Sequence, residues 1–493
     1  MAEVLDKLYA LVWGVPALVL IAGVGLYLSI RTGFAQLRLF PAACRSFWRR
    51  LTGKEVTAAG VSPFQALCTA LAATVGTGNL AGVAGALSIG GPGAIFWMWV
   101  CALLGMGTKL AEAALAVRYR VKENDEFLGG PMYIISKGMG KRWHWLAGVY
   151  AFFGVVAAFG VGNATQINTV IVGINDCITA FGGQVSRKTD VLMGLILAAV
   201  VFAMFLGGAG RIGAAAEKLV PFAAAVYLLM SSAVLVLRVN ALPGAFRAIV
   251  QGAFSPRAVT GGVVGSILVT LRIGVSRGVF TNEAGMGTAG IAHGSADVQH
   301  PVDQGLMGIM EVFLDTVVIC TMTALVILCS GVPVPYGIDA GVRLTADAFS
   351  SVMGPWIKVF IAASLCLFAF ATILGWGLYG ARCAQYLFGR KVWTRFAVLQ
   401  AVTVVVGAVL NTTVIWQMAE IVNGLMAIPN LISLAVLAPE LQRLINEYKT
   451  GRNAGGGTLC KFPSMQTAAN PLPCESSTPS RWKPRSGERR SII

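Results

Sequence analysis

The sequence predicts an all-α integral membrane protein with about eleven transmembrane helices. Of its 493 residues, 56% are hydrophobic and only 12% are charged, whereas a soluble globular protein carries roughly 25% charged residues. Long apolar runs recur along the chain, for example at 13–30 and 191–206, and each is close to the roughly 20 residues that a helix needs to cross a bilayer. A soluble protein with a single membrane anchor is therefore excluded.

The first apolar run, at 13–30, predicts a peripheral helix ahead of a core of ten helices. Charged clusters and Gly/Pro clusters set the boundaries of the other runs. The ten core helices are expected at 63–89, 92–118, 143–172, 190–208, 213–237, 260–291, 302–330, 354–388, 393–411 and 413–440. The first run is expected to stay in the protein, because no small-residue cleavage pattern follows it.

The formal net charge of +16 indicates membrane topology, because the basic residues cluster in short segments between apolar runs. The positive-inside rule places such segments in the cytoplasm. The first of them contains Arg31, Arg38, Arg45, Arg49, Arg50 and Lys54. We therefore expect a multi-pass protein in the lipid bilayer with a periplasmic N-terminus, and no nucleic-acid partner.

The composition changes beyond residue 440 to Gly, Ser, Pro and scattered basic residues. A segment of this composition cannot bury enough apolar surface to fold. The stretch 441–493 is therefore predicted to be a disordered, basic cytoplasmic tail.

The first core helix is interrupted in its middle by the segment 74–79 (TVGTGN). Unwound backbone at membrane depth is tolerated only where it is buried in protein or lines a cavity. Freed N–H groups at the start of the second half-helix can bind a carboxylate, and freed carbonyls can bind a cation. A substrate carboxylate is therefore expected on the backbone N–H groups near Thr77, Gly78 and Asn79.

The sixth core helix has a similar interruption at 271–285 (LRIGVSRGVFTNEAG), about half of the ten-helix span further along. Glycine also lets membrane helices pack closely, which is the competing explanation for either segment alone. Carbonyls near Gly274 to Ser276 are expected to accept from a substrate ammonium, and Asn282 is a further candidate contact.

Paired interruptions at corresponding positions of two halves indicate a transporter with inverted repeats and a site near the midplane. The predicted organisation is an N-terminal helix and basic loop at 1–60, repeats of five helices at 61–240 and 241–440, and the tail at 441–493.

Five segments resemble the alanine/glycine:cation symporter family. They are 62–82 (SPFQALCTALAATVGTGNLAG), 90–105 (GGPGAIFWMWVCALLG), 129–133 (GGPMY), 277–285 (RGVFTNEAG) and 423–430 (NGLMAIPN). With the helix pattern, the resemblance covers about 13–440. It implies the five-plus-five inverted-repeat fold of leucine-type sodium symporters with one extra N-terminal helix. It also implies co-transport of alanine or glycine with Na⁺ across a prokaryotic inner membrane.

The resemblance implies a cation site that combines carbonyls of the first break with hydroxyls of the eighth core helix. Ala72, Val75 and Thr372 occupy those positions. Hard cations such as Na⁺ prefer oxygen ligands, and Na⁺ is the only metal ion expected. Relatives have a second hydroxyl where this chain has Ala371, so one ligand is expected to be missing.

Two more residues are candidates for the wall of the substrate pocket. The resemblance implies a hydrogen bond from Gln166, a polar residue of the third core helix. Trp376 lies about one turn beyond Thr372 on the same helix face, where it could cap the pocket. The alternative for Trp376 is a packing or interfacial role.

Ionisable residues at membrane depth are costly and mark function by default. Glu311 and Asp315 are four residues apart and so lie on one helix face. They form either a proton or ion relay, or a structural pair with Arg272, Arg277 or a backbone group, and the structural pair is favoured. Lys109 and Glu112 lie nearer a helix end, where snorkelling of their side chains is the expected explanation.

The sequence contains no Walker loop, GxSxG or HExxH motif. An enzyme is therefore not expected, nor is any cofactor apart from Na⁺ as coupling ion or any obligate protein partner. The remaining alternatives are a proton-coupled or differently selective amino-acid carrier and, less favoured, a passive channel. A channel would show repeated pore motifs, whereas the two breaks differ in sequence.

Overall fold

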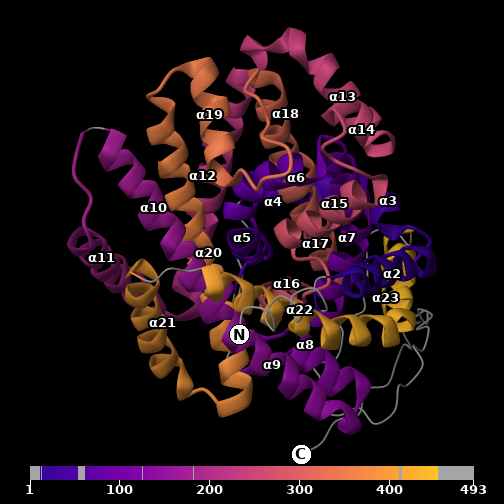
Figure 1. Ribbon diagram of the computed structural model, residues 1–493. Coiled ribbons are helices and arrows are strands. Elements are labelled where there is room, and N and C mark those ends of the chain that lie inside the picture. Colours follow the sequence, from indigo (N-terminus) through magenta and orange to yellow (C-terminus); the bar gives the residue numbers. More distant parts are fainter. Residues whose placement is uncertain are drawn as a thin grey trace, which may run out of the picture.

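A computed structural model describes Val12 and residues 14–53, 61–124, 126–180, 182–409 and 413–453. The described chain is a bundle of helices (Figure 1) to which one short antiparallel hairpin is attached. In the hairpin, strand β1 (Val121–Glu123) pairs with strand β2 (Glu126–Leu128), and Val121 lies opposite Leu128.

Seven helices in the described residues are long and apolar enough to cross a membrane, and two bent helix pairs raise the possible number to nine. The bundle consists of α2 (Val15–Arg31), α5 (Pro63–Thr74), η1 (Gly78–Gly82), α6 (Val83–Gly90), α7 (Gly93–Arg118), α9 (His144–Phe159), η4 (Gly160–Ala164), α10 (Thr165–Ala180), α11 (Arg187–Leu206), α12 (Gly208–Leu237), α15 (Ile267–Asn282), α16 (Thr288–His293), α17 (Pro301–Val312), η6 (Phe313–Cys320), α18 (Thr321–Ser330), α20 (Ile357–Phe388), α21 (Val392–Val409) and α22 (Thr413–Val436). The segments η1, η4 and η6 are π-helical.

Shorter helices lie between and around these elements. They are α3 (Ala35–Arg38), α4 (Phe40–Thr52), α8 (Pro131–Tyr133), η2 (Ile134–Met139), η3 (Lys141–Trp143), η5 (Val239–Ala241), α13 (Leu242–Phe254), α14 (Pro256–Thr260), α19 (Gly341–Met353) and α23 (Ala438–Asn453).

Each of the ten predicted core helices has a helical counterpart in the described part of the chain. Agreement is good for α7, which is predicted at 92–118 and observed at Gly93–Arg118. The predicted and observed bounds agree least where an α-helix is interrupted by a π-helical segment. The single helix predicted at 143–172 is observed as α9, η4 and α10 in succession. Helices α13 and α19 have no predicted counterpart, since each has 13 residues and is too short to cross a bilayer.

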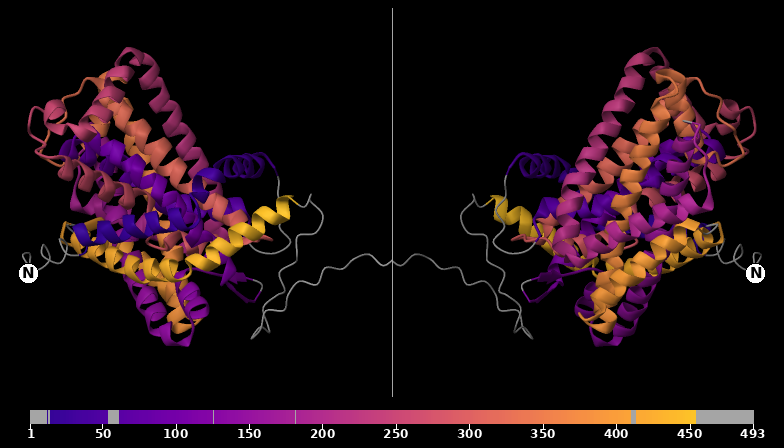
Figure 2. Two further views of the ribbon diagram at one scale, coloured as in Figure 1. Left: turned by 90° about the vertical axis from the view of Figure 1, so that its right-hand side faces the viewer. Right: turned by 90° about the vertical axis from the view of Figure 1, so that its left-hand side faces the viewer.

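The prediction of disorder after the last core helix is wrong for its first part. The chain continues as helix α23 as far as Asn453, at a bend of 59° to α22, and both appear in yellow across the other helices in Figure 2. Leu441, Leu444 and Ile445 recur at helical spacing and are fully buried. This apolar stripe explains why the segment folds. The rest of the predicted tail, 454–493, lies outside the described residues.

Buried hydrophobic residues form two large clusters that meet at α5. The first surrounds α7, which packs against α15 and α17, and the second surrounds α20, which packs against α9 and α10. Helix α5 contributes Leu67 and Leu71 to the first cluster and Ala70 and Ala73 to the second. The end of α5 therefore lies at the boundary between two groups of helices.

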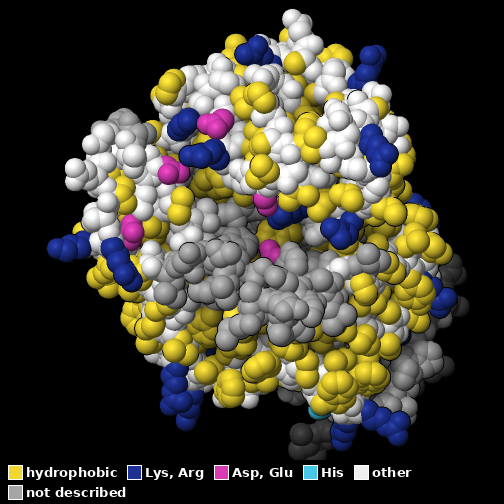
Figure 3. Space-filling model, viewed as in Figure 1, with side chains coloured by type: hydrophobic (Ala, Val, Ile, Leu, Met, Phe, Trp, Pro, Cys, Tyr) yellow, Lys and Arg dark blue, Asp and Glu magenta, His cyan; other side chains and the backbone are white. Residues whose placement is uncertain are grey.

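The outer surface matches a membrane environment. Hydrophobic side chains cover much of the face in Figure 3, and Lys and Arg are scattered over it, mostly toward the edges. On α11, Leu192, Leu195 and Ile196 are each more than half exposed, at 59%, 52% and 58%. Burial in lipid accounts for apolar side chains that no protein atom covers.

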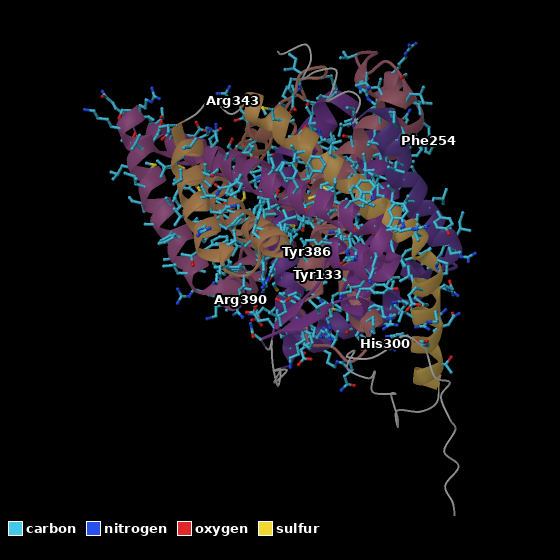
Figure 4. All side chains as sticks on the ribbon, turned by 90° about the horizontal axis from the view of Figure 1, so that it is seen from below. Tyr133, Phe254, His300, Arg343, Tyr386 and Arg390 are labelled. Atoms are coloured by element: carbon cyan, nitrogen blue, oxygen red, sulfur yellow. The ribbon has the colours of Figure 1, made fainter. Side chains whose placement is uncertain are left out.

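Two segments that are far apart in the sequence, near residues 126–133 and 382–386, lie together in the structure. Tyr133 and Tyr386 pack edge to face, with ring centroids 5.3 Å apart (Figure 4). Arg382 forms an ion pair with Glu126 at 3.1 Å on the same side. Arg343 lies toward the opposite end of the bundle in Figure 4. Which side faces the cytoplasm stays a prediction.

Candidate functional site

The first predicted break is present between α5 and η1. Helix α5 ends at Thr74, and the backbone is extended at Val75 (ψ 99°) before helical winding resumes. The N–H of Gly76 donates to Oδ1 of Asn79 at 2.8 Å, so it is not available to the carbonyl of Ala72, four residues before it. The two halves are bent by 54°. The end of α5 and the start of η1 therefore present unpaired backbone groups.

The second break is present but lies further along than predicted. Helix α15 runs without interruption through Gly274 and Ser276, and it ends at Asn282. Glu283 follows in the left-handed conformation, with φ 52°. The predicted break at Gly274 to Ser276 is wrong because Gly274 serves helix packing, and a Cβ there would collide with the carbonyl of Ala94 on α7. The carbonyls at these positions belong to a continuous helix.

A buried carboxylate of α7 holds the backbone of the second break. Oε1 of Glu112 accepts from the N–H groups of Gly285 and Gly287 at 2.9 and 3.0 Å. It also accepts from Nδ2 of Asn430 on α22 at 2.9 Å, and the same amide nitrogen donates to the carbonyl of Gly285. The 283–287 turn is therefore anchored to two helices of the bundle.

A small pocket lies between the two breaks. Its wall consists of Ala73, Thr74, Gly76, Thr77, Gly78, Val161, Gln166, Phe280, Glu283, Thr372, Trp376 and Asn423. Five of the predicted site residues are in this wall, namely Thr77, Gly78, Gln166, Thr372 and Trp376. Gly78 begins η1 and Thr77 directly precedes it. Gln166 comes from α10, and Thr372 and Trp376 come from α20.

Trp376 is held in the wall from two sides. Its indole N–H donates to Oε1 of Glu283 at 2.8 Å, and Oε2 of the same carboxyl group accepts from the Thr288 hydroxyl at 2.7 Å. Gly162, in the π-helical segment η4, lies directly under the ring, and a Cβ there would collide with the Trp376 side chain. Packing and hydrogen bonding together fix the orientation of the indole.

Gln166 connects α10 to the first break. Its Oε1 accepts from the Thr77 hydroxyl at 3.4 Å, and its Nε2 donates to the carbonyl of Val161 at 3.2 Å. The amide therefore lies in the pocket wall beside the start of η1, where the sequence places a substrate carboxylate.

The Thr372 hydroxyl lies against the first break. A Cβ on Gly76 would be only 2.8 Å from Thr372 Oγ1, which shows how closely the hydroxyl approaches the unwound backbone. The hydroxyl donates to the carbonyl of Phe368 at 3.0 Å, so its oxygen keeps acceptor capacity for a cation. The neighbouring Ala371 is buried and has no side-chain oxygen.

Asn79 and Asn282 lie outside the pocket wall, contrary to their predicted contact with substrate. Nδ2 of Asn79 donates to Asp315 Oδ1 at 2.7 Å, and Nδ2 of Asn282 donates to the Thr316 hydroxyl at 3.1 Å. Both amides therefore attach a helix break to η6. Ala72 and Val75 are also outside the wall, although their carbonyls are at the end of α5.

Lys109, Glu311 and His293 form a buried ionic cluster. Lys109 Nζ lies 2.7 Å from Glu311 Oε1, His293 Nε2 lies 3.0 Å from Glu311 Oε2, and all three side chains have no exposed surface. Gln304 extends this cluster, because its Nε2 lies 2.7 Å from His293 Nδ1. The expected snorkelling of Lys109 is therefore wrong, because Glu311 neutralises it in the interior.

The predicted pairing of Glu311 or Asp315 with arginines of the sixth core helix is also wrong. Arg277 pairs with Asp339 at 3.1 Å near the surface, and Arg272 is exposed. Since α15 is continuous through this segment, its helical register directs both guanidinium groups away from η6.

Glu283, Glu112 and His293 belong to the site but are missing from the predicted set. Applying the rule for ionisable residues at membrane depth to every such residue finds Glu283, and it finds Glu112 if its position near a helix end is not taken as evidence of snorkelling. His293 gives no comparable signal, because its predicted position is the end of a helix.

A family model described as the sodium:alanine symporter family matches residues 1–461 of the chain. This chain belongs to that family. The sodium/alanine symporter AgcS of Methanococcus maripaludis is 40% identical to it over 444 residues, which cover 88% of this chain and 94% of AgcS. The probable sodium/glutamine symporter GlnT of Bacillus subtilis is 36% identical over 447 residues, or 90% of each protein.

The solved structure of MhsT in complex with L-phenylalanine has a similar fold, with a TM-score of 0.54 at 14% identity over 80% of this chain and 99% of MhsT. This likeness and the apolar helices confirm the predicted helical membrane fold of the leucine-transporter type. Membership of the sodium:alanine symporter family confirms the resemblance found in the sequence. The chain is a multi-pass membrane transporter and not an enzyme.

Proposed function

We propose that this sodium:alanine symporter family member imports alanine, glycine or a similarly small neutral amino acid together with Na⁺ across the bacterial inner membrane. The observation that carries the proposal is the pocket between two half-helix ends of opposite polarity. The amide end of η1 begins at Gly78, and the carbonyl end of α15 is at Asn282. A Cβ on Gly78 would be 3.3 Å from Thr281 Cγ2, so the two ends are in contact.

This arrangement suits a zwitterion. The substrate carboxylate would bind the amides at Thr77 and Gly78, where the helix dipole is positive, with Gln166 beside it. The ammonium would bind the Glu283 carboxyl group and the carbonyl end of α15, where the dipole is negative. This assignment replaces the carbonyls near Gly274, which a continuous helix uses for its own hydrogen bonds.

The pocket wall favours a small side chain. Phe280 and the fully buried Trp376 are both in the wall, and packing on Gly162 prevents the indole from moving back. For this reason we propose alanine and glycine, although one relative carries the name of a glutamine symporter.

Sodium is proposed to bind the carbonyls of Ala72 and Val75 and the hydroxyl of Thr372, as the sole coupling ion and without any other cofactor. The hydroxyl lies against the same break that would hold the carboxylate, which gives a physical route for coupling the two ligands. The repeats 61–240 and 241–440 would then move against each other in alternating access around this site, with the N-terminus periplasmic and the C-terminus cytoplasmic.

Uptake of labelled alanine into proteoliposomes tests this proposal. An inward Na⁺ gradient should drive accumulation, and an equal K⁺ gradient, or vesicles without protein, should not. Excess unlabelled alanine or glycine should compete, while glutamine should compete poorly. Uptake that responds to neither a Na⁺ nor a proton gradient would contradict the symporter proposal. Efficient competition by glutamine would contradict only the proposed preference for small side chains.

A further inference from the structure

An apolar groove on the outer surface lies between α2 and the end of α22. Its walls are Val19, Leu20, Gly23, Val24 and Tyr27 of α2 and Ala435 and Val436 of α22. Helix α2 packs against α22 and α23, and the three lie side by side in Figures 1 and 2. Val19 is 63% exposed and Val436 is 53% exposed. The described part of the chain therefore leaves this groove open to the lipid.

One face of α2 leads from the groove to a positive charge. Leu20, Gly23 and Tyr27 follow one another at spacings of three and four residues, so they lie on the same helix face. Arg31, the exposed last residue of α2, lies on that face one turn beyond Tyr27. Exposed tyrosine rings are typical of the boundary between hydrocarbon and lipid headgroups. The position of Arg31 therefore corresponds to the headgroup level.

Two further cationic side chains lie around this end of α2. The guanidinium group of Arg38 donates to the carbonyl of Thr32, the residue that follows Arg31. Lys449 of α23 is close to it, since partial burial and the nearby Arg38 guanidinium lower the pKa of the Lys449 ammonium. Three positive charges from α2, α3 and α23 therefore lie at one end of the groove.

These three cations have no counter-charge in the part of the chain that the structure describes, since none of them forms an ion pair there. The carboxylates of α23 are engaged elsewhere, Glu440 with Arg118 at 2.9 Å and Glu447 with Arg443 at 3.5 Å. Neighbouring cations repel one another, and an anion bound between them removes that repulsion. Basic pockets between transmembrane helices accordingly bind anionic lipid headgroups.

The two helices of the groove also hold the turn of the second break. A Cβ on Gly285 would be 3.2 Å from Leu431 of α22 and 3.5 Å from Ile21 of α2. Nδ2 of Asn430 on α22 donates to the carbonyl of Gly285 at 2.9 Å. A ligand that joins α2 to α22 would therefore stabilise this turn.

We propose that the groove binds one anionic phospholipid of the bilayer, with an acyl chain between α2 and α22 and the phosphate between Arg31, Arg38 and Lys449. The chain suits walls that are apolar apart from the Tyr27 hydroxyl, and the phosphate supplies the missing negative charge. The bound lipid holds α2 against α22 and thereby stabilises the 283–287 turn. The site goes beyond the proposed function, because it does not depend on which amino acid or ion is transported.

Native mass spectrometry of the full-length protein in a neutral detergent tests the headgroup contacts. The wild type should retain one molecule of phosphatidylglycerol and not the zwitterionic phosphatidylcholine. Arg31→Gln combined with Lys449→Gln should weaken phosphatidylglycerol binding by about tenfold or more. Arg38 is kept, since its bond to Thr32 supports the turn after α2.

Arg390→Gln combined with Lys391→Gln is the matched control. It removes two exposed charges from the loop between α20 and α21 (Figure 4), and phosphatidylglycerol binding should stay at the wild-type level. An equal loss in the two double variants would show a general effect of surface charge and overturn the assigned headgroup contacts.

Gly23→Leu tests the groove itself while all three cations remain. A Cβ at Gly23 meets no atom within 4 Å, so the larger side chain fills the groove without disturbing the fold, and phosphatidylglycerol binding should be lost. Gly148→Leu on α9 is the control, because its position is equally open. Amide hydrogen exchange of the 283–287 turn should slow when phosphatidylglycerol is added to the wild type and stay unchanged in Gly23→Leu.

Three further results would overturn the inference. They are equal retention of phosphatidylglycerol and phosphatidylcholine, normal phosphatidylglycerol binding in Gly23→Leu, and exchange of the 283–287 turn that bound phosphatidylglycerol does not slow. Lipid-free dimers that Gly23→Leu separates would assign the groove to a second copy of the chain instead. A protein that binds phosphatidylglycerol in this way but takes up no alanine would reject the proposed function and leave the lipid site intact.

Discussion

The indole N–H of Trp376 lies 2.8 Å from Oε1 of Glu283, and this bond connects α20 to the second helix break across the pocket. Trp376 lies on α20, and Glu283 lies in the turn that follows α15. Glu283 has the left-handed backbone conformation that a non-glycine residue adopts only where its surroundings impose it. The pair therefore fixes both the pocket wall and the turn that begins there.

Replacing Trp376 by Phe should weaken alanine transport. The ring is kept, but Glu283 loses a donor in a buried position, which costs about 1.5–3 kcal/mol for a hydrogen bond to a charged group. The half-saturating alanine concentration is expected to rise by about tenfold or more. This concentration is obtained from initial uptake rates in proteoliposomes over a range of alanine concentrations.

Trp393→Phe is the matched control. Its indole N–H donates to the carbonyl of Phe205 at 2.9 Å, outside the pocket wall. The half-saturating alanine concentration should stay near the wild-type value. Equal effects of both substitutions would show that loss of an indole N–H donor in general, and not the contact with Glu283, is responsible.

Replacing Thr372 by Ala should weaken Na⁺ binding. The substitution removes the side-chain oxygen that lies against Gly76. The Na⁺ concentration for half-maximal alanine uptake should rise by about tenfold or more. Thr403→Ala is the control, since its hydroxyl also donates to the carbonyl four residues earlier, at 2.9 Å, but is exposed. An unchanged Na⁺ requirement in Thr372→Ala would reject the assigned cation site.

Ala371→Ser should have the opposite effect on Na⁺. The added hydroxyl is small enough for a buried position next to Thr372, and it restores the second oxygen that the family resemblance implies. The Na⁺ concentration for half-maximal uptake is expected to fall by several-fold, about 1 kcal/mol in binding free energy. Titration of uptake against Na⁺ in the same vesicles measures this change. A higher requirement would mean that the extra oxygen disturbs packing without reaching the ion.

Gly162→Ala should impair transport by moving Trp376. The new methyl group would collide with the indole, and overpacking of a tight interior typically costs 1–3 kcal/mol. Gly148→Ala on α9 is the control, because a Cβ there meets no atom within 4 Å. Alanine affinity should fall in Gly162→Ala alone. Normal affinity in Gly162→Ala would mean that the ring position does not limit binding.

The structure could be predicted from the sequence where local residue preferences determine it. The break near Gly76 could be predicted because two glycines and two threonines end a helix through local preferences, and the carbonyls and amides at such an end are necessarily unpaired. Thr77 and Gly78 then followed from their position at the break, Thr372 from the family resemblance, and Trp376 from its place one turn beyond Thr372. The structure places all four in one pocket wall.

The second break could not be located in the same way. Gly274 and Gly278 resemble helix breakers in the sequence, but the structure uses both for close packing of α15 on α7. The actual turn at Glu283 depends on Glu112 and Asn430, which are far away in the chain and hold its amides and carbonyl. These anchors are tertiary contacts, which no local sequence pattern predicts.

The Lys109–Glu311 pair gives the last prediction. Lys109→Met should leave Glu311 buried with His293 alone, and loss of one partner of a buried pair costs about 3–5 kcal/mol of stability. Adding Glu311→Gln to Lys109→Met should recover most of the loss, because no unpaired charge remains. Denaturant titration in detergent micelles measures the free energy of unfolding. Lys358→Met, which removes a surface pair with Asp347, should cost less than about 1 kcal/mol. If Lys109→Met is no less stable than Lys358→Met, the buried cluster does not support the fold.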